Sequence, residues 1–214
     1  MTQEVTPTLR SGITSKFSSA KSVFSACYKI WRDMIFPPFC MSCGEPCETK
    51  LFCPDCWELC SPPDPAQKCP HCFEDSEGLC NRCRKAPLLP FSQAYVFDDV
   101  EPARLLVRQP SDIVAAFAMR SWIALDWLTP DVILPMPGSG EIALAFSEMI
   151  ERPLAHLFAG NRDGHCDVEA INADQIILVI GEGGSLQEYK HAVKALSAAE
   201  PKRGYLLSLF QMRE

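Results

Sequence analysis

Apolar residues after Pro87 fall into short runs that alternate with stretches of helical spacing. The runs are short and predict strands, and they lie at 93–97, 132–134, 176–180 and 205–210. The intervening patterns predict helices, and these lie at 103–107, 111–128, 142–150 and from 185 to about 199. Ser111 is a candidate N-cap for the second of them. Strands alternating with helices predict an α/β fold with a small, mainly parallel sheet and flanking helices over 87–214.

The N-terminal third begins with two segments of different texture. Residues 1–16 are rich in Ser and Thr, slightly basic and poor in acids, which suits a flexible tail better than a transit peptide. Large apolar residues then recur at helical spacing and predict an amphipathic helix over 17–36, which Pro37 and Pro38 end. Its apolar face, over 17–35, could bind a protein partner or a membrane, or cover the chain's own core.

Four C-x-x-C pairs occupy the segment 37–86. They consist of Cys40, Cys43, Cys53, Cys56, Cys69, Cys72, Cys80 and Cys83. A tight C-x-x-C turn aims two sulfurs at one ion, and two such turns complete a tetrahedral zinc site. The Pro-rich linker 61–65 separates the second pair from the third and favours two sequential zinc ribbons, each built from neighbouring pairs. A cross-braced pairing would have to fold across that linker.

Zinc fits these cysteines better than disulfide bonds do. Eight of the twelve cysteines lie in regular pairs, and no apolar signal-peptide core precedes them, so a reducing cytoplasm is expected. The segment has few apolar residues, and structural zinc adds roughly 10–16 kcal/mol of apparent binding energy in finger peptides. His71 lies between two ligands and is not expected to bind metal. Cys47 and Cys60 are spare thiols that could substitute as ligands.

Charge and hydropathy narrow the classes of partner. The net charge of −7 argues against a general polyanion binder. A modest basic edge near the second ribbon, formed by Lys68, Arg82, Arg84 and Lys85, is opposed by several acids in the same segment. No apolar run is long enough for a transmembrane segment.

A second candidate site follows the strongest predicted strand. The loop consists of Gly181, Glu182, Gly183, Gly184 and Ser185, and a helix follows it. Glycine-rich turns between a strand and a helix can hold phosphate on backbone N–H groups. The pattern is weak, because it is neither a Walker loop nor a dinucleotide fingerprint, and such turns are also ordinary connections.

The order of these parts resembles the ComF family, whose members join zinc ribbons to a type I phosphoribosyltransferase-like domain and are linked to competence and natural transformation. The resemblance rests on the phrase Ile35-Phe36-Pro37-Pro38-Phe39-Cys40-x-x-Cys43-Gly44, on the further C-x-x-C pairs, on Pro135-Met136-Pro137 and on the Leu178-Val179 strand before a Gly-containing loop. It implies a double zinc ribbon at 37–86 and a phosphoribosyltransferase-like domain at 87–214.

The departures from that family pattern concern catalysis. Family members carry an acidic pair after Leu-Val and then a Thr-Thr-Gly loop, whereas Leu178-Val179 is followed here by Ile180-Gly181. The basic run that follows Pro-x-Pro in the family is replaced by Gly138-Ser139-Gly140-Glu141. The resemblance therefore implies a degenerate domain, a pseudoenzyme, in which 181–185 could retain phosphate binding.

Three functions are open at this point. The first is a zinc-binding, non-catalytic accessory factor in DNA uptake, with single-stranded DNA or DNA-uptake proteins as partners. The second is a phosphoribosyltransferase with an atypical site, which would need Mg²⁺ and could use Glu182 in place of the missing acids. The third is a structural adaptor that docks through the helix at 17–35.

Overall fold

The computed structural model describes residues 28, 38–48, 51–87, 89–155, 171–172 and 174–212. The chain divides into two compact units, residues 1–53 and 54–214. The tail predicted at 1–16 lies outside the described residues, and so does the helix predicted at 17–36 apart from Tyr28, which is helical and exposed. The partition proposed from the sequence, with boundaries at 37 and 87, stays a prediction.

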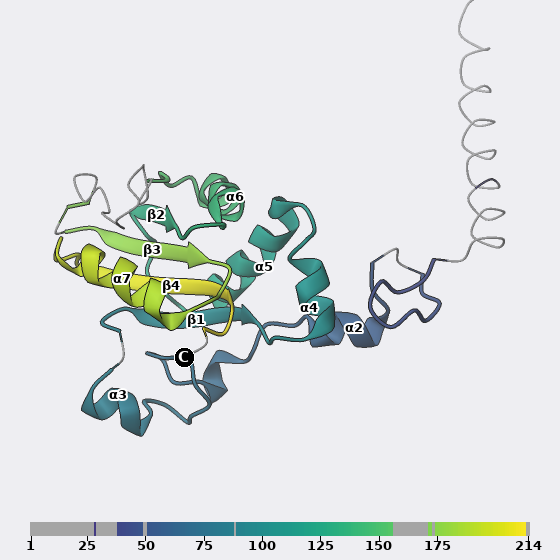
Figure 1. Ribbon diagram of the computed structural model, residues 1–214, viewed down its shortest axis with the longest axis horizontal. Helices are drawn as coiled ribbons and strands as arrows, with labels where there is room; N and C mark the ends of the chain where they lie inside the picture. Colours follow the sequence, from purple (N-terminus) through teal and green to yellow (C-terminus); the bar gives the residue numbers. More distant parts are fainter. Residues whose placement is uncertain are drawn as a thin grey trace, which may run out of the picture. The chain divides into compact units, whose positions relative to one another are not determined.

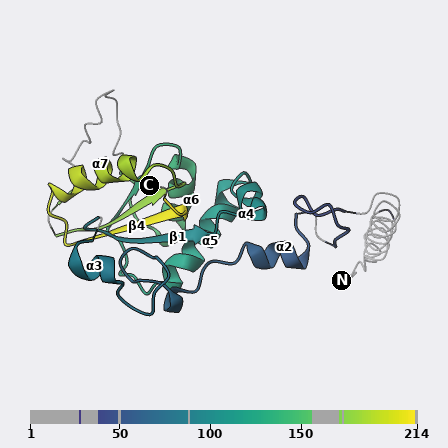
Figure 2. The same cartoon turned by 60° about the horizontal axis from the view of Figure 1, so that its bottom comes forward.

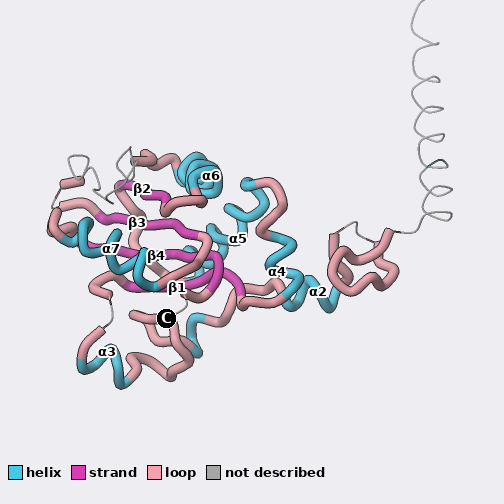
Figure 3. The backbone as a smooth tube through the Cα atoms, in the orientation of Figure 1, coloured by secondary structure: helices cyan, strands magenta, loops and turns pink. Residues whose placement is uncertain are grey.

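The second unit is built on a four-stranded parallel sheet (Figure 1). Its strands are β1 (Ser92–Phe97), β2 (Val132–Pro135), β3 (Ile176–Gly181) and β4 (Arg203–Phe210). They lie in the order β1-β4-β3-β2, as the tube in Figure 3 also shows, and all three pairings are parallel. The α/β fold and the parallel sheet predicted from the apolar runs are confirmed.

Helices cover both faces of this sheet. They are α5 (Ser111–Ala124), α6 (Gly140–Ile150) and α7 (Leu186–Ser197), and the short helix α4 (Glu101–Leu106) follows β1. One face packs under α7, where Ile177, Val179 and Leu206 join the buried residues of that helix in one core cluster. The alternate residues Leu178, Ile180 and Leu207 are equally buried, on the face that α5 and α6 cover. Because both faces are buried, the central strands are apolar throughout rather than alternating.

Two details of α5 differ from the sequence prediction. The helix ends at Ala124 rather than near residue 128, and Asp126 takes a left-handed φ of 51°. The chain leaves the helix there because Trp127 stacks on Tyr205 of β4, with ring centroids 4.6 Å apart. The expected Ser111 cap is wrong, since Pro110 holds the cap position and no side chain caps the helix.

Three short elements precede the sheet within this unit. They are α2 (Pro54–Leu59), the 3₁₀ turn η1 (Pro65–Gln67) and α3 (Asn81–Lys85). Figure 2 brings α3 and its flanking turns forward. Within the described part of the chain, no helix has both the length and the apolar character needed to cross a membrane.

Candidate metal centres and the loop after β3

The eight paired cysteines gather into two groups of four. The first group is Cys40, Cys43, Cys53 and Cys56, and the second is Cys69, Cys72, Cys80 and Cys83. Within each group all four sulfurs lie within 4.8 Å of one another. The grouping follows the sequential pairing predicted from the linker rather than the cross-braced one.

The spacing of the sulfurs fits a tetrahedral ion. With Zn–S bonds of about 2.3 Å, two ligands of a tetrahedral site lie about 3.8 Å apart. Cys43 Sγ and Cys53 Sγ are 3.6 Å apart, and so are Cys72 Sγ and Cys80 Sγ. This separation is far above the S–S bond length of a disulfide. The donor set therefore suits zinc, and all eight thiols predicted as ligands lie in position to provide it.

The first turn of each group is built in the same way. Cys40 N–H donates to the Glu45 carbonyl at 2.8 Å, and Gly44 N–H donates back to the Cys40 carbonyl at 3.0 Å. In the second group Cys69 N–H donates to the Glu74 carbonyl at 2.8 Å, and Phe73 N–H donates to the Cys69 carbonyl at 2.9 Å. A short antiparallel bridge closes each turn. These bonds hold the two sulfurs of each C-x-x-C on one side.

A left-handed residue makes each turn possible. Gly44 has a φ of 76°, and Phe73 has a φ of 60° at the equivalent place in the second group. Glycine adopts this conformation freely, whereas it is unfavourable for a bulky residue. The Phe73 ring is buried and packs edge-on against Tyr95 of β1, with centroids 5.1 Å apart. Packing on the sheet therefore stabilises a backbone conformation that phenylalanine would otherwise avoid.

Backbone donors favour the thiolate form of several ligands. Burial would raise the pKa of Cys40, but the backbone N–H groups of Cys43, Cys53 and Ser42 outweigh it and lower the pKa to about 6. At Cys69, burial is again outweighed, here by the backbone N–H groups of Cys72, Cys80 and His71, and the pKa falls to about 6. Two sulfurs thus approach the charged state in which thiols bind metal.

The last two ligands of the second group, Cys80 and Cys83, are positioned by α3. Cys80 is the N-cap of this helix, and its sulfur accepts the Cys83 N–H at 3.4 Å. The Cys80 N–H in turn donates to Cys69 Sγ at 3.4 Å. The Cys83 N–H lowers the pKa of Cys80, whereas burial and the neighbouring sulfurs raise that of Cys83. An arrangement of four converging sulfurs with N–H donors stabilises negative charge, which a divalent cation would then partly offset.

The residues between and beside the ligands have other contacts. His71 Nε2 lies 2.8 Å from the Leu89 carbonyl oxygen, and the His71 carbonyl accepts the Gln93 N–H of β1 at 2.7 Å. His71 therefore ties the second group to the strand. Cys60 is buried and Cys47 half-buried, and neither belongs to either group of four.

Lys68 makes a further link from the second group to the sheet. Its ammonium donates to Asp75 Oδ1 at 2.6 Å and to the Tyr95 hydroxyl at 2.9 Å. It also lies 5.3 Å from the centroid of the Tyr95 ring. Burial opposes the charge of Lys68, but Asp75 and Tyr95 together raise its pKa. The basic edge expected around this residue is thus partly used inside the fold.

The glycine loop after β3 is closed by contacts within the chain. Gly183 N–H donates to the Tyr189 hydroxyl at 3.1 Å, and Ser185 Oγ accepts the Gln187 N–H at 3.2 Å as the cap of α7. A hollow of ≈ 280 Å³ adjoins this loop at the carboxyl ends of the strands. Its lining includes Asp99 and Glu182 and contains no Lys or Arg among the described residues. Phosphate binding by 181–185 stays a prediction, and these carboxylates oppose an anion.

The neighbouring loop after β2 also serves packing. Ser139 is fully buried, and its hydroxyl shares its one hydrogen between the carbonyl oxygens of Met136 at 2.8 Å and Ile180 at 2.7 Å. It therefore holds the ends of β2 and β3 together. Gly138 lies beside the Glu182 carboxylate, since a Cβ placed on it would be 3.9 Å from Glu182 Oε2.

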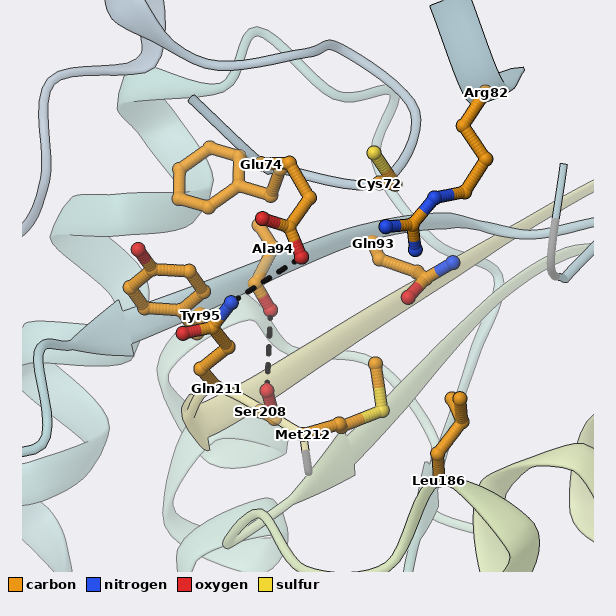
Figure 4. A pocket seen from close by; sticks show the side chains of 11 residues that line it. Cys72, Glu74, Arg82, Gln93, Ala94, Tyr95, Leu186, Ser208, Gln211 and Met212 are labelled. Carbon is orange, nitrogen blue, oxygen red and sulfur yellow. Dashed lines mark hydrogen bonds between the residues drawn. The ribbon is translucent and has the colours of Figure 1, made fainter. Parts of the chain in front are cut away.

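A small cavity that the sequence does not reveal lies between the second cysteine group and the sheet. Its volume is ≈ 50 Å³, and Cys72, Arg82 and Gln93 are among its lining residues (Figure 4). A polar Gln93 in the run 93–97, whose other residues are hydrophobic, is the one signal in the sequence that could have indicated it.

Comparison with models of known protein families gives no match, and no curated protein sequence matches either. The ComF resemblance therefore stays an expectation carried by short motifs. What the chain does has to be argued from the two cysteine groups and their surroundings.

Proposed function

We propose that this chain is a zinc-binding protein with two four-cysteine sites and a non-catalytic α/β domain, and that it acts as an accessory or binding factor. The observation that carries the proposal is the convergence of two sets of four sulfurs, each set within 4.8 Å. Zinc would supply cross-linking here rather than reaction chemistry, because four protein ligands leave no open position.

The loop after β3 supports the non-catalytic part of the proposal. Pyrophosphate chemistry needs a held metal and positive groups that stabilise the leaving charge. Here one loop N–H is used by Tyr189, and the side chains that line the hollow are acidic or uncharged. No side chain described at the loop supplies the positive charge that a leaving pyrophosphate requires.

The ComF resemblance extends the proposal to DNA uptake, with single-stranded DNA as the ligand. The α3 helix supports this version, because Arg82, Arg84 and Lys85 are exposed on it next to the second cysteine group. The overall charge of −7 restricts such binding to a local patch.

The test is fluorescence anisotropy of a labelled single-stranded oligonucleotide at low and at physiological salt. We expect saturable binding that weakens as salt rises, is lost when a chelator removes zinc, and weakens in the double variant Arg84→Gln/Lys85→Gln. The matched control is Lys190→Gln/Lys194→Gln on α7, which removes the same charge elsewhere. Absence of salt-sensitive binding would reject the DNA version and leave the zinc sites to be judged by metal content.

The hollow at the carboxyl ends of the strands favours one alternative, a phosphoribosyltransferase with an atypical site. Ligands of parallel α/β sheets bind at this edge, and Glu182, Gly183 and Gly184 line the hollow. Phosphoribosyl pyrophosphate with Mg²⁺ should then raise the melting temperature. An unchanged melting temperature at saturating ligand would eliminate this alternative without affecting the zinc proposal.

A further inference from the structure

The cavity beside the second cysteine group has walls from three parts of the second unit. Cys72 and Arg82 come from the cysteine group and α3, Gln93 from β1 and Leu186 from the start of α7 (Figure 4). Its volume of ≈ 50 Å³ compares with roughly 10–15 Å³ for one water on the same measure, so about four small atoms fit. The cavity thus suits a functional group rather than a whole cofactor.

Gln93 is the observation that points to a ligand. The residue is only 5% exposed, and its Nε2 has no hydrogen-bond partner among the described residues. An amide donor buried without an acceptor is costly, so its presence in this largely apolar strand calls for a partner. The terminal amide also carries an acceptor beside the donor, and the best complement has one of each.

The charges around Gln93 select a neutral group. Arg82 offers guanidinium donors, whereas Glu74 presents a carboxylate that accepts from Gln211 Nε2 at 3.3 Å. A cysteine group with a bound divalent cation would carry net negative charge close to Cys72. A carboxylate ligand would therefore be repelled by this negative charge, and an ammonium ligand would be repelled by the Arg82 guanidinium. A carboxamide is neutral and meets neither repulsion. Together with the carbon atom to which it is attached, it has four heavy atoms, which is the number that fits the cavity.

We propose that this cavity binds a carboxamide group, from a small free amide or from an Asn or Gln side chain of a peptide. The ligand carbonyl accepts from Gln93 and Arg82, and the ligand N–H₂ donates to Glu74 or to the Gln93 carbonyl oxygen. No bond is formed or broken. The site is independent of the glycine loop after β3 and of any nucleic-acid binding.

The test uses the zinc-loaded full chain labelled with ¹⁵N, titrated with acetamide and followed by NMR. The side-chain amide signal of Gln93 is assigned by its loss in Gln93→Met. We expect a saturable shift of this signal with acetamide, and a much smaller one with sodium acetate or ammonium chloride at equal ionic strength. Arg82→Gln should weaken acetamide binding about fivefold or more, as loss of a hydrogen bond from a charged donor does.

Arg84→Gln is the matched control, because it removes the same charge from the same helix at a residue that does not line the cavity. Glu74→Gln gives a second variant at an exposed position if Gln93→Met folds poorly, and it should also weaken binding. Circular dichroism and zinc content must match the parent for each variant that is compared.

Two results would overturn the proposal. One is acetate binding as tightly as acetamide, and the other is an acetamide response that Arg82→Gln and Arg84→Gln reduce equally. The source of the group is decided by a second titration with an Asn-containing tripeptide and its Leu analogue. Selective binding of the Asn peptide assigns the cavity to a protein partner, and binding of acetamide alone assigns it to a small free amide.

Discussion

The hydroxyl of Tyr189, on α7, accepts a hydrogen bond from the backbone N–H of Gly183 at 3.1 Å. Tyr189 is 1% exposed, so the whole ring is buried beneath the end of β3. The hydroxyl also lies directly against the Cα of Gly181, where any Cβ would overlap it. The glycine loop is thus packed around a tyrosine from the following helix.

Gly181→Ala should destabilise the protein by about 1–3 kcal/mol, because the added methyl group overpacks the site against Tyr189. Denaturant unfolding measures the loss. Gly140→Ala is the control, since a Cβ there meets nothing within 4 Å at the first residue of α6. If Tyr189 is the cause, the double variant Gly181→Ala/Tyr189→Phe must lose less stability than the two single changes added together.

Tyr189 should also make stability fall between about pH 10 and pH 12. Burial, with smaller contributions from the charges of Glu188 and Glu182, raises the pKa of Tyr189 to about 12, although the hydrogen bond from Gly183 N–H lowers it. The unfolded chain, with a tyrosine pKa near 10, releases its proton first, so stability is fully present below pH 10 and is lost as pH rises. The free energy of unfolding should fall by a total that approaches about 3 kcal/mol once the pH exceeds the folded-state pKa.

The measurement is the difference in unfolding free energy between the parent and Tyr189→Phe across this pH range. The variant should be less stable at neutral pH by about 1–3 kcal/mol, because Gly183 N–H loses its partner. Its stability should then fall less steeply above pH 10. Parallel pH profiles for the two proteins would show that Tyr189 does not titrate as stated.

Metal content should be about two zinc ions per chain, one for each group of four sulfurs. Cys69→Ser should lower it to about one, because serine is a poor zinc ligand, and should destabilise the second unit. Cys47→Ser should retain both ions, since Cys47 belongs to neither group. Elemental analysis of protein purified without added metal provides the values, and equal zinc in all three proteins would contradict the ligand assignment.

Lys68→Met should cost about 1–3 kcal/mol of stability, because the Tyr95 hydroxyl and Asp75 lose a charged donor that is largely buried. Zinc content should stay unchanged, since Lys68 is not a ligand. Lys85→Met, at an exposed position in α3, is the control and should be nearly neutral. A Lys68→Met protein as stable as the control would mean that solvent replaces these contacts.

The sheet and the ligand groups follow closely from the sequence, whereas the left-handed turns and the cavity do not. The C-x-x-C spacing and the Pro-rich linker determine which sulfurs come together, because both act between residues that are close in the sequence. A glycine at position 44 indicates a left-handed turn from the sequence alone. Phe73 gives no such indication, because its left-handed conformation is stabilised by the packing of its ring against Tyr95. The closure of the glycine loop depends on Tyr189, whose helical spacing indicates burial but not which backbone atom the hydroxyl reaches.

The pairing of the first strand with the last has a consequence for how the chain is made. Ser92 of β1 is matched with Tyr205 of β4, about half the chain length away, and β4 lies between β1 and β3. During synthesis β1 therefore remains unpaired until β4 is made, while nearly all of the remaining chain emerges from the ribosome. Exposed strand edges at that stage invite aggregation, and distant pairings form slowly. The His71–Gln93 and Lys68–Tyr95 contacts use only residues already translated, so a metal-loaded second group can shield the nascent strand until β4 arrives.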